Sequence, residues 1–366
     1  MIPTLHLIDP DAIQSELNRI WDSLETTNTT RACLFNLIFY TKKDYRTGYI
    51  QKLSQAVIEK FPARVIFIII DSSHSGDQLT TQVSILNSSQ GDYDVACDFI
   101  QITGTATSQV KIPFIILPHI LPDLPVYLVL AEDPSHEDPL TRSLETFANR
   151  LIFDSESTDH LAHFAASALE HHHTTRADIA DLNWARIESW REMLSAAFYS
   201  KERLQELKQM KSIQLTYNSH SSTYFCHTRI QSLYLQAWLA SQLNWTLTKV
   251  TTEEGALKID YSTDYSPLTI SLIPISNADL PPGLILSMDL TTSEGTHFTF
   301  QRDLQSIHQI TLNISTALRC ELPCKYIFAK AESGHSLVKE ICHRGTSQHF
   351  VNVLKLIQKM ETQGLC

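Results

Sequence analysis

Glycine is scarce and widely scattered in this sequence. The 366 residues include ten glycines, and no two of them lie closer than 11 positions apart. Phosphate-binding loops need several glycines close together, because the backbone must approach the phosphate groups closely. The sequence therefore has neither a G-x-G-x-x-G nor a G-x-x-x-x-G-K-[ST] motif, and we expect no nucleotide cofactor.

Other patterns that mark catalytic or metal sites are also absent. There is no G-x-S-x-G nucleophile elbow, no H-E-x-x-H and no C-x-x-C. The seven cysteines are odd in number and irregular in spacing, which favours free thiols in a reducing cytoplasm. We therefore expect a protein that is not an enzyme.

Positive charge and long apolar runs are limited as well. The net charge of −11 argues against nucleic-acid binding, which depends largely on Lys and Arg. The longest apolar runs, such as residues 64–71, are far too short to span a bilayer. The first residues lack the basic stretch of a signal peptide, so we expect a cytoplasmic protein with no membrane partner.

What is present indicates an α/β protein. Helical spacing of apolar residues predicts helices over 10–25 and 48–61. Strands are predicted over 31–41, 64–71, 79–86, 95–103, 125–133 and 149–155. Alternating strands and helices favour a mostly parallel sheet covered by helices, with 79–86 and 95–103 as an antiparallel insertion.

Proline marks the transition to the second half. Six of the fourteen prolines lie in 113–139, which predicts a short helix broken at Pro118 or Pro122. The stretch from 140 to about 210 has none, and we expect it to be mainly helical.

The second half has its own pattern. A strand is expected over 212–219, an amphipathic helix over 229–245, short strands of an antiparallel sheet over 246–343, and a last helix over 347–360. We therefore predict an N-terminal α/β domain (1–175) and a C-terminal α+β domain (176–366) that includes a helical junction over 181–211.

Histidine is frequent, and its clusters raise the question of a metal. His160 and His163 are three positions apart on an expected helix, and His171, His172 and His173 lie at its end. Cations are favoured near a helix C-terminus, so we expect a solvated helix end and no metal site, with a specific metal role as the alternative.

The stretch DLNWARIESWREML (181–194) is the most distinctive segment. Asp181 can cap a helix, and Arg186 and Trp190 are four apart, so a cation–π contact is possible. Trp and Arg are also enriched at interface hot spots. Two interpretations stay open, a helix packed at the domain junction and a partner-binding site, and both involve Asp181, Trp184, Arg186, Trp190 and Arg191.

This stretch resembles the signature D-L-x-W-x-R-L-x-x-W-R of the OpcA family, the glucose-6-phosphate dehydrogenase assembly proteins, with Ile187 in place of Leu. Further segments are similar to family motifs in the same order. They are TRACLFNLIFYT (30–41), FPARVIFIIID (61–71, with Phe61 where His is usual), LPDLPVYLVLAED (121–133, without the usual tryptophans) and RIQSLYLQAWLASQLNW (229–245).

The resemblance covers about 30 to 340 and implies a function. Proteins of this family are described as binding glucose-6-phosphate dehydrogenase and promoting its active oligomer in the oxidative pentose phosphate pathway. They are not known as catalysts. In photosynthetic relatives a link to thioredoxin-type redox control has been made, which implies a thioredoxin-type reductant as a second partner.

Two alternatives remain from the residues themselves. One is a sugar-phosphate or nucleotide-binding α/β enzyme, with Arg64, Asp71 and the loop Ser72 to Gly76 as candidate site residues at the ends of strands. The other is a thiol-based redox sensor acting through Cys320 and Cys324, which are separated by ELP.

Overall fold

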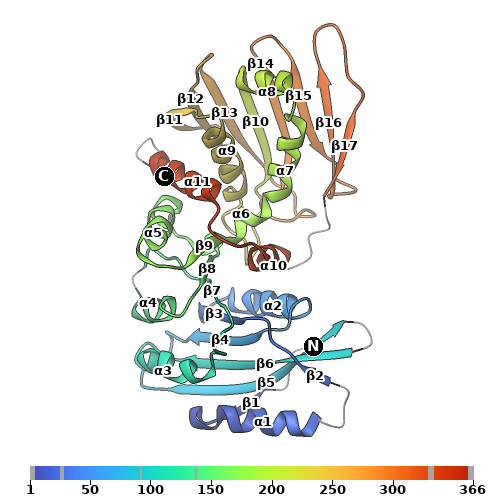
Figure 1. Cartoon of the computed structure of the whole chain (residues 1–366). Helices are drawn as coiled ribbons and strands as arrows, with labels where there is room; N and C mark the ends of the chain where they lie inside the picture. The colour runs from blue at the N-terminus through green and yellow to red at the C-terminus, as the bar shows by residue number, and fades with distance from the viewer. Residues whose placement is uncertain (1–4, 25–28, 91–92, 137, 329–333, 362–366) are drawn as a thin grey trace. The chain divides into compact units, whose positions relative to one another are not determined.

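The computed structural model describes residues 5–24, 29–90, 93–136, 138–328 and 334–361 (Figure 1). Its contacts divide the chain into two compact units, each built from segments distant in sequence. Unit 1 comprises Met1–Asp159, Glu170–Leu182 and Glu332–Thr346, and unit 2 comprises His160–Leu169, Asn183–Ala331 and Ser347–Cys366. The two domains predicted from sequence, divided at residue 175, stay a prediction.

Within its described residues, unit 1 contains a nine-stranded sheet. Six neighbouring strands run parallel in the order β6-β4-β3-β7-β8-β9. Their bounds are β3 Asn36–Lys42, β4 Arg64–Ile70, β6 Tyr93–Gly104, β7 Val126–Leu130, β8 Arg150–Phe153 and β9 Asp178–Asp181. Renumbered along the chain, this is the order 3-2-1-4-5-6 of the dinucleotide-binding Rossmann fold. The predicted mostly parallel sheet is confirmed.

The predicted antiparallel pairing of 79–86 with 95–103 is confirmed, but the pair is not an insertion, because β6 also pairs in parallel with β4 and of the two only β5 (Leu79–Gln90) lies outside the parallel strands. β5 runs antiparallel to β6, and β1 (His6–Ile8) runs antiparallel to β5. The short β2 (Thr29–Arg31) pairs in parallel with β6.

The buried strands explain why helices surround this sheet. Every residue of β4 is buried, and so is every residue of β3 except Lys42. A run that is apolar on both faces needs cover on both faces. α2 (Thr47–Ile58) packs on β3 and α1 (Ile13–Leu24) packs on β5, close to the predicted helices.

The proline-rich segment forms short helical pieces, as predicted. α3 (Ile112–Ile116) ends before a 3-10 turn, η3 (Leu117–His119), which contains Pro118. The remaining helical elements of unit 1's first segment are η1 (Pro10–Ala12), η2 (Ser108–Lys111), α4 (Pro139–Glu145) and η4 (Ser155–Ser157). α5 (Leu161–Thr174) follows them in the chain.

One element of unit 1 corrects the sequence prediction. Residues 335–342, expected among the short strands, form helix α10 (His335–Cys342). Glu340 of α10 pairs with Arg150 of β8 at 2.6 Å, and both side chains are buried. Gly334 precedes α10 with φ 84°, and a Cβ there would lie 2.5 Å from the Cβ of Ala56 in α2. The fold of this segment therefore depends on partners from the first half of the chain.

Unit 2 carries the predicted C-terminal sheet. Among the residues described, it has eight strands in the order β11-β12-β13-β10-β14-β15-β16-β17. All neighbours are antiparallel except β10 and β13, which are parallel. The bounds are β10 Met210–Asn218, β11 Thr246–Glu253, β12 Ala256–Ser262, β13 Leu268–Ile275, β14 Ile285–Thr292, β15 His297–Arg302, β16 Gln309–Ser315 and β17 Cys324–Ile327.

Helix α9 (Ile230–Gln242) is the centre of unit 2. Ten of its 13 residues are buried, so it is enclosed on more than the single face that was predicted. It packs against β13 and against α11 (Gln348–Glu361), the predicted last helix. Its buried Gln236 accepts a hydrogen bond of 2.7 Å from the hydroxyl of Tyr261, which satisfies a polar group inside the core.

Candidate functional site

The tryptophan stretch is not the single helix that was predicted. Asp181 is the last residue of β9, α6 spans Leu182–Arg186, and α7 spans Glu188–Ala197. Between the helices, the fully buried Ile187 has φ −90° and ψ 3°, in the sparsely populated bridge region. The two tryptophans therefore belong to separate helices and reach different neighbours.

Asp181 belongs to unit 1 and has no solvent exposure. Its carboxylate accepts hydrogen bonds from the backbone N–H of Ser155 at 2.9 Å and from the Ser155 hydroxyl at 3.1 Å. Predicted as a helix cap, it directly precedes α6 and also ties the end of β9 to the turn after β8. A buried carboxylate held in this way fixes the backbone at the end of the sheet.

Trp184 lies in an aromatic cluster of unit 2. It is 4% exposed, and its ring centroid is 5.6 Å from that of Phe350 in α11. The guanidinium of Arg191 lies 3.4 Å from the centroid of the Trp184 ring and donates a 3.3 Å hydrogen bond to the Trp184 carbonyl. This is a cation–π contact combined with a backbone bond.

Trp190 makes its cation–π contact with a different arginine, Arg302. Trp190 is 3% exposed, and Arg302 of β15 lies over its ring at 5.6 Å. Burial lowers the pKa of Arg302 to about 10, so the guanidinium stays charged at neutral pH. The four-residue spacing of Arg186 and Trp190 made a cation–π contact between them possible; in the structure, the guanidinium of Arg186 lies 4.9 Å from the centroid of the Phe225 ring. Sequence reasoning missed Arg302 because nothing local links it to Trp190.

In a Rossmann fold, the glycine-rich loop that binds the dinucleotide follows the first strand of the parallel sheet. In unit 1 that strand is β3, so the corresponding loop is the one after β3. Here the loop is Lys43, Asp44, Tyr45 and Arg46, and α2 follows. One carboxylate oxygen of Asp44 accepts from the backbone N–H of Arg46 at 2.7 Å and of Thr47 at 3.1 Å. The start of α2, where a pyrophosphate would bind, thus holds a carboxylate of the chain itself.

Arg46 is the last residue of this loop. It is buried and forms an ion pair with Asp154, which follows β8 and has no exposure. Beside it, the cavity at the ends of β3 and β7, lined by residues including Tyr40, Lys42 and Glu132, has a volume of about 10 Å³. Small-molecule sites measure roughly 300–1,000 Å³, so this cavity holds one water at most.

Of the residues of the sugar-phosphate alternative, Asp71 and the loop Ser72 to Gly76 lie together, but Arg64 lies apart from them. Asp71 follows β4 at its carboxyl end, whereas Arg64 begins β4 at the opposite end, roughly 23 Å away for an extended strand. The side chain of Lys43 donates to Asp71 at 2.6 Å, and this bond, with those from Ser73, holds the pKa of Asp71 well below its usual range. Arg64 pairs with the buried Asp98.

The two candidate redox cysteines lie on the last hairpin of unit 2. Both are exposed. Cys324 pairs with Leu312 and Cys320 with Ser315, so three residues of the extended β16 separate their partners, about 10 Å. A disulfide needs Cα atoms within roughly 7 Å. Bonding them requires this part of the hairpin to leave the sheet.

Among the residues that the structure describes, no helix combines the length and apolar character needed to cross a bilayer.

Two family models match the sequence in consecutive order. Residues 54–170 match the OpcA model described as the glucose-6-phosphate dehydrogenase subunit N-terminal domain, and residues 177–335 match the corresponding C-terminal domain. The chain belongs to the OpcA family. An OxPP cycle protein OpcA of Synechococcus elongatus is 25% identical over 251 residues, which cover 66% of this chain and 54% of the relative. An OxPP cycle protein OpcA of Synechocystis is 27% identical over 165 residues, which cover 45% of this chain and 33% of the relative.

The OpcA relatives are thus longer than the part that this chain matches, which is about half of the first relative and a third of the second. Solved structures show the fold alone. The super-repressor mutant of Gal80p from Saccharomyces cerevisiae has a TM-score of 0.51 at 9% identity, covering 91% of this chain and 96% of that one. An NAD binding oxidoreductase from Klebsiella pneumoniae has a TM-score of 0.50 at 7% identity, covering 91% and 97%.

Proposed function

We propose that this chain is a non-catalytic partner that binds glucose-6-phosphate dehydrogenase and promotes its active oligomer. The two OpcA family matches support this proposal. The observation that carries the non-catalytic part of this proposal is that the crevice of unit 1, at the carboxyl ends of β3 and β7, leaves a cavity of only about 10 Å³. In a sheet of Rossmann order, Asp44 holds the start of α2 and the Arg46–Asp154 pair lies behind it. In this proposal, the carboxylate of Asp44 takes the place at the start of α2 where the pyrophosphate of a dinucleotide would bind.

Activation by a partner needs no catalytic group. A protein that binds the active state of an enzyme more tightly than the inactive state shifts the population toward the active one. A tenfold preference corresponds to about 1.4 kcal/mol at 25 °C. A single well-buried contact at an interface can supply that difference.

For the contact surface we propose the outer hairpin of unit 2, which comprises β16, β17 and the turn between them. β17 is the last strand in the order of the sheet, and a strand edge can pair with another chain. Leu318, Leu322 and Ile327 on this hairpin are 97%, 94% and 80% exposed. Trp184 and Trp190 are buried. In this proposal the stretch 181–194 therefore does not touch the partner, and it stabilises the fold of unit 2 that presents the outer hairpin.

The test is a titration of purified cognate glucose-6-phosphate dehydrogenase with this chain, following activity and, by light scattering, mass. We expect a saturable rise in activity together with a complex of defined size. The variant Leu318→Ser with Leu322→Ser should weaken complex formation at least tenfold, whereas Tyr199→Ser, at 89% exposed in the same unit, serves as the matched control. No complex with the wild-type chain would overturn the function, and equal binding by all variants would overturn only the surface.

The enzyme alternative is tested separately by calorimetry of the isolated chain with glucose 6-phosphate and with NADP. We expect no heat of binding for either compound, because the crevice is closed by the chain's own groups. Saturable heat with NADP would contradict the non-catalytic proposal.

A further inference from the structure

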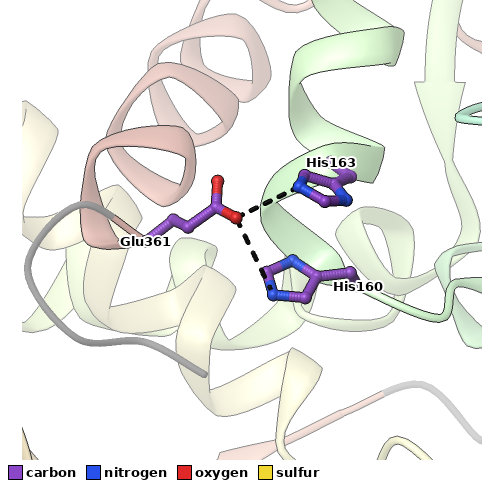
Figure 2. Close-up of side chains that lie close together, drawn as sticks. All are labelled: His160, His163 and Glu361. Atoms are coloured by element: carbon purple, nitrogen blue, oxygen red, sulfur yellow. Dashed lines mark ion pairs between the residues drawn. The ribbon is translucent and has the colours of Figure 1, made fainter.

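Three side chains of unit 2 converge on one point, as Figure 2 shows. His160 directly precedes α5, and its carbonyl accepts the first helical hydrogen bond from Phe164. His163 lies in the first turn of α5, and Glu361 is the last residue of α11. Both imidazoles point toward the carboxylate of Glu361, although Glu361 lies 198 positions after His163 in the sequence.

The distances suit a metal ion. The Nε2 atoms of His163 and His160 lie 3.1 Å and 3.8 Å from the same oxygen, Oε1 of Glu361. One potential ligand atom from each residue lies within 4.8 Å of the other two. Zinc bonds to nitrogen and oxygen of about 2.0–2.2 Å place tetrahedral ligand atoms about 3.3–3.6 Å apart. The two nitrogen-to-oxygen distances lie within a few tenths of an ångström of this range, so modest side-chain movement lets the three atoms share one ion.

A plain ion pair explains the arrangement less well. The imidazole rings lie 4.5 Å apart at 29°, almost stacked, and both face the same carboxylate. Exposed ion pairs contribute little to stability, and the side chains of His163 and Glu361 are 61% and 36% exposed. A metal ion instead uses both neutral imidazoles and the carboxylate as ligands.

We propose that His160, His163 and Glu361 form a binding site for a divalent transition metal, with zinc as the expected ion. Two imidazoles and one carboxylate are a ligand set that zinc accepts, and water completes the tetrahedron on the exposed side. The site joins the first turn of α5 to the last turn of α11 and so anchors the end of α11. From the sequence we expected a solvated helix end at these histidines, with a specific metal role as the alternative.

The experiment is calorimetry of the metal-stripped full-length chain with ZnCl₂, followed by the absorption spectrum with CoCl₂. We expect one zinc ion per chain and the intense visible bands of tetrahedral Co²⁺. The variants His163→Ala and Glu361→Gln should lose more than the roughly 10- to 100-fold in affinity that follows loss of a group supporting a ligand. Glu361→Gln keeps the size of the side chain, so folding is preserved.

The matched control is His172→Ala with His173→Ala, which removes two imidazoles from the other end of the same helix. It should bind zinc and cobalt like the wild-type chain. Circular dichroism melts should show that zinc raises the Tm of the wild type and the control but not of the two ligand variants. Absence of stoichiometric zinc binding, or unchanged affinity in His163→Ala and Glu361→Gln, would overturn the proposal.

Discussion

The guanidinium of Arg191 covers the indole of Trp184, 3.4 Å from the ring centroid, and donates to the carbonyl of that same residue. One side chain of α7 thereby holds both the ring and the backbone of α6 across the break at Ile187. Within the stretch 181–194, the contact between Arg191 and Trp184 therefore stabilises the packing of α6 against α7.

Replacing Arg191 should therefore destabilise the protein before it affects any partner. We expect Arg191→Ala to lower the free energy of unfolding by about 1–3 kcal/mol, through loss of the cation–π contact and the hydrogen bond. Arg191→Lys should recover only part of this, because an ammonium group lacks the planar fork. Urea denaturation measures both, with Arg319→Ala, whose side chain is 75% exposed, as the control. A fully stable Arg191→Ala protein that no longer activates the dehydrogenase would instead indicate direct docking.

The buried ion pair Arg46–Asp154 should show coupled effects on stability when its members are replaced. Arg46→Met leaves the carboxylate of Asp154 buried without its cation, and we expect a loss of about 3–5 kcal/mol in unfolding free energy. The double variant with Asp154→Asn should be more stable than Arg46→Met alone, since no unpaired charge remains. Denaturant curves of the wild type, both single variants and the double variant complete the cycle. Strictly additive losses would show that the two residues do not interact.

Asp98 should make unit 1 sensitive to acid. Burial by itself would raise the pKa of this carboxyl, but hydrogen bonds from Arg31 and Trp21 and the charge of Arg64 outweigh burial and hold the pKa below its usual value. Because the folded-state pKa is depressed, the stabilisation is complete above the unfolded value of about 3.9 and is lost as the pH falls through the folded value.

We therefore expect Asp98→Asn to be less stable than wild type by about 3 kcal/mol at neutral pH. This difference in unfolding free energy between the wild type and Asp98→Asn should decrease as the pH falls below about 4. Denaturation midpoints measured from pH 7 to pH 2 give the comparison, with the exposed Asp279→Asn as the control. A difference that stays constant over this range would show that the charge of Asp98 is not the cause.

The outer hairpin makes a prediction about redox control. With β17 in its register, Cys320 and Cys324 are too far apart to bond directly. Mild oxidation under native conditions should leave both thiols open to alkylation, and mass spectrometry should find the Cys320–Cys324 disulfide only after the hairpin is loosened by denaturant. A native-state disulfide, combined with loss of activation that Cys320→Ser with Cys324→Ser prevents, would establish the redox-sensor alternative.

Local pattern was enough to predict most elements of both units. The apolar run 64–71 predicted β4, and helical spacing predicted α2, α9 and α11 close to their observed positions. These segments are long or strongly periodic, so their character is set by their own residues. The loop after β3, residues 43–46, contains no glycine, as the scattered glycine positions require.

What the sequence did not predict depends on distant partners. Six parallel strands are compatible with many orders, and the Rossmann order arises from the crossovers between them. Helix α10 relies on Arg150, Trp190 is covered by Arg302, and Glu361 meets His163 only after unit 2 has folded. No local spacing encodes these pairs, which are each more than a hundred positions apart.

The Arg46–Asp154 pair also bears on how the chain responds to its surroundings. A dinucleotide-binding fold gains stability in proportion to the logarithm of its cofactor concentration, since the ligand binds only the folded state. Here Arg46 and Asp154 provide a cation and an anion from the chain itself. Under the non-catalytic function proposed above, the population of folded chains should stay constant while the cell's pools of oxidised and reduced nucleotide rise and fall.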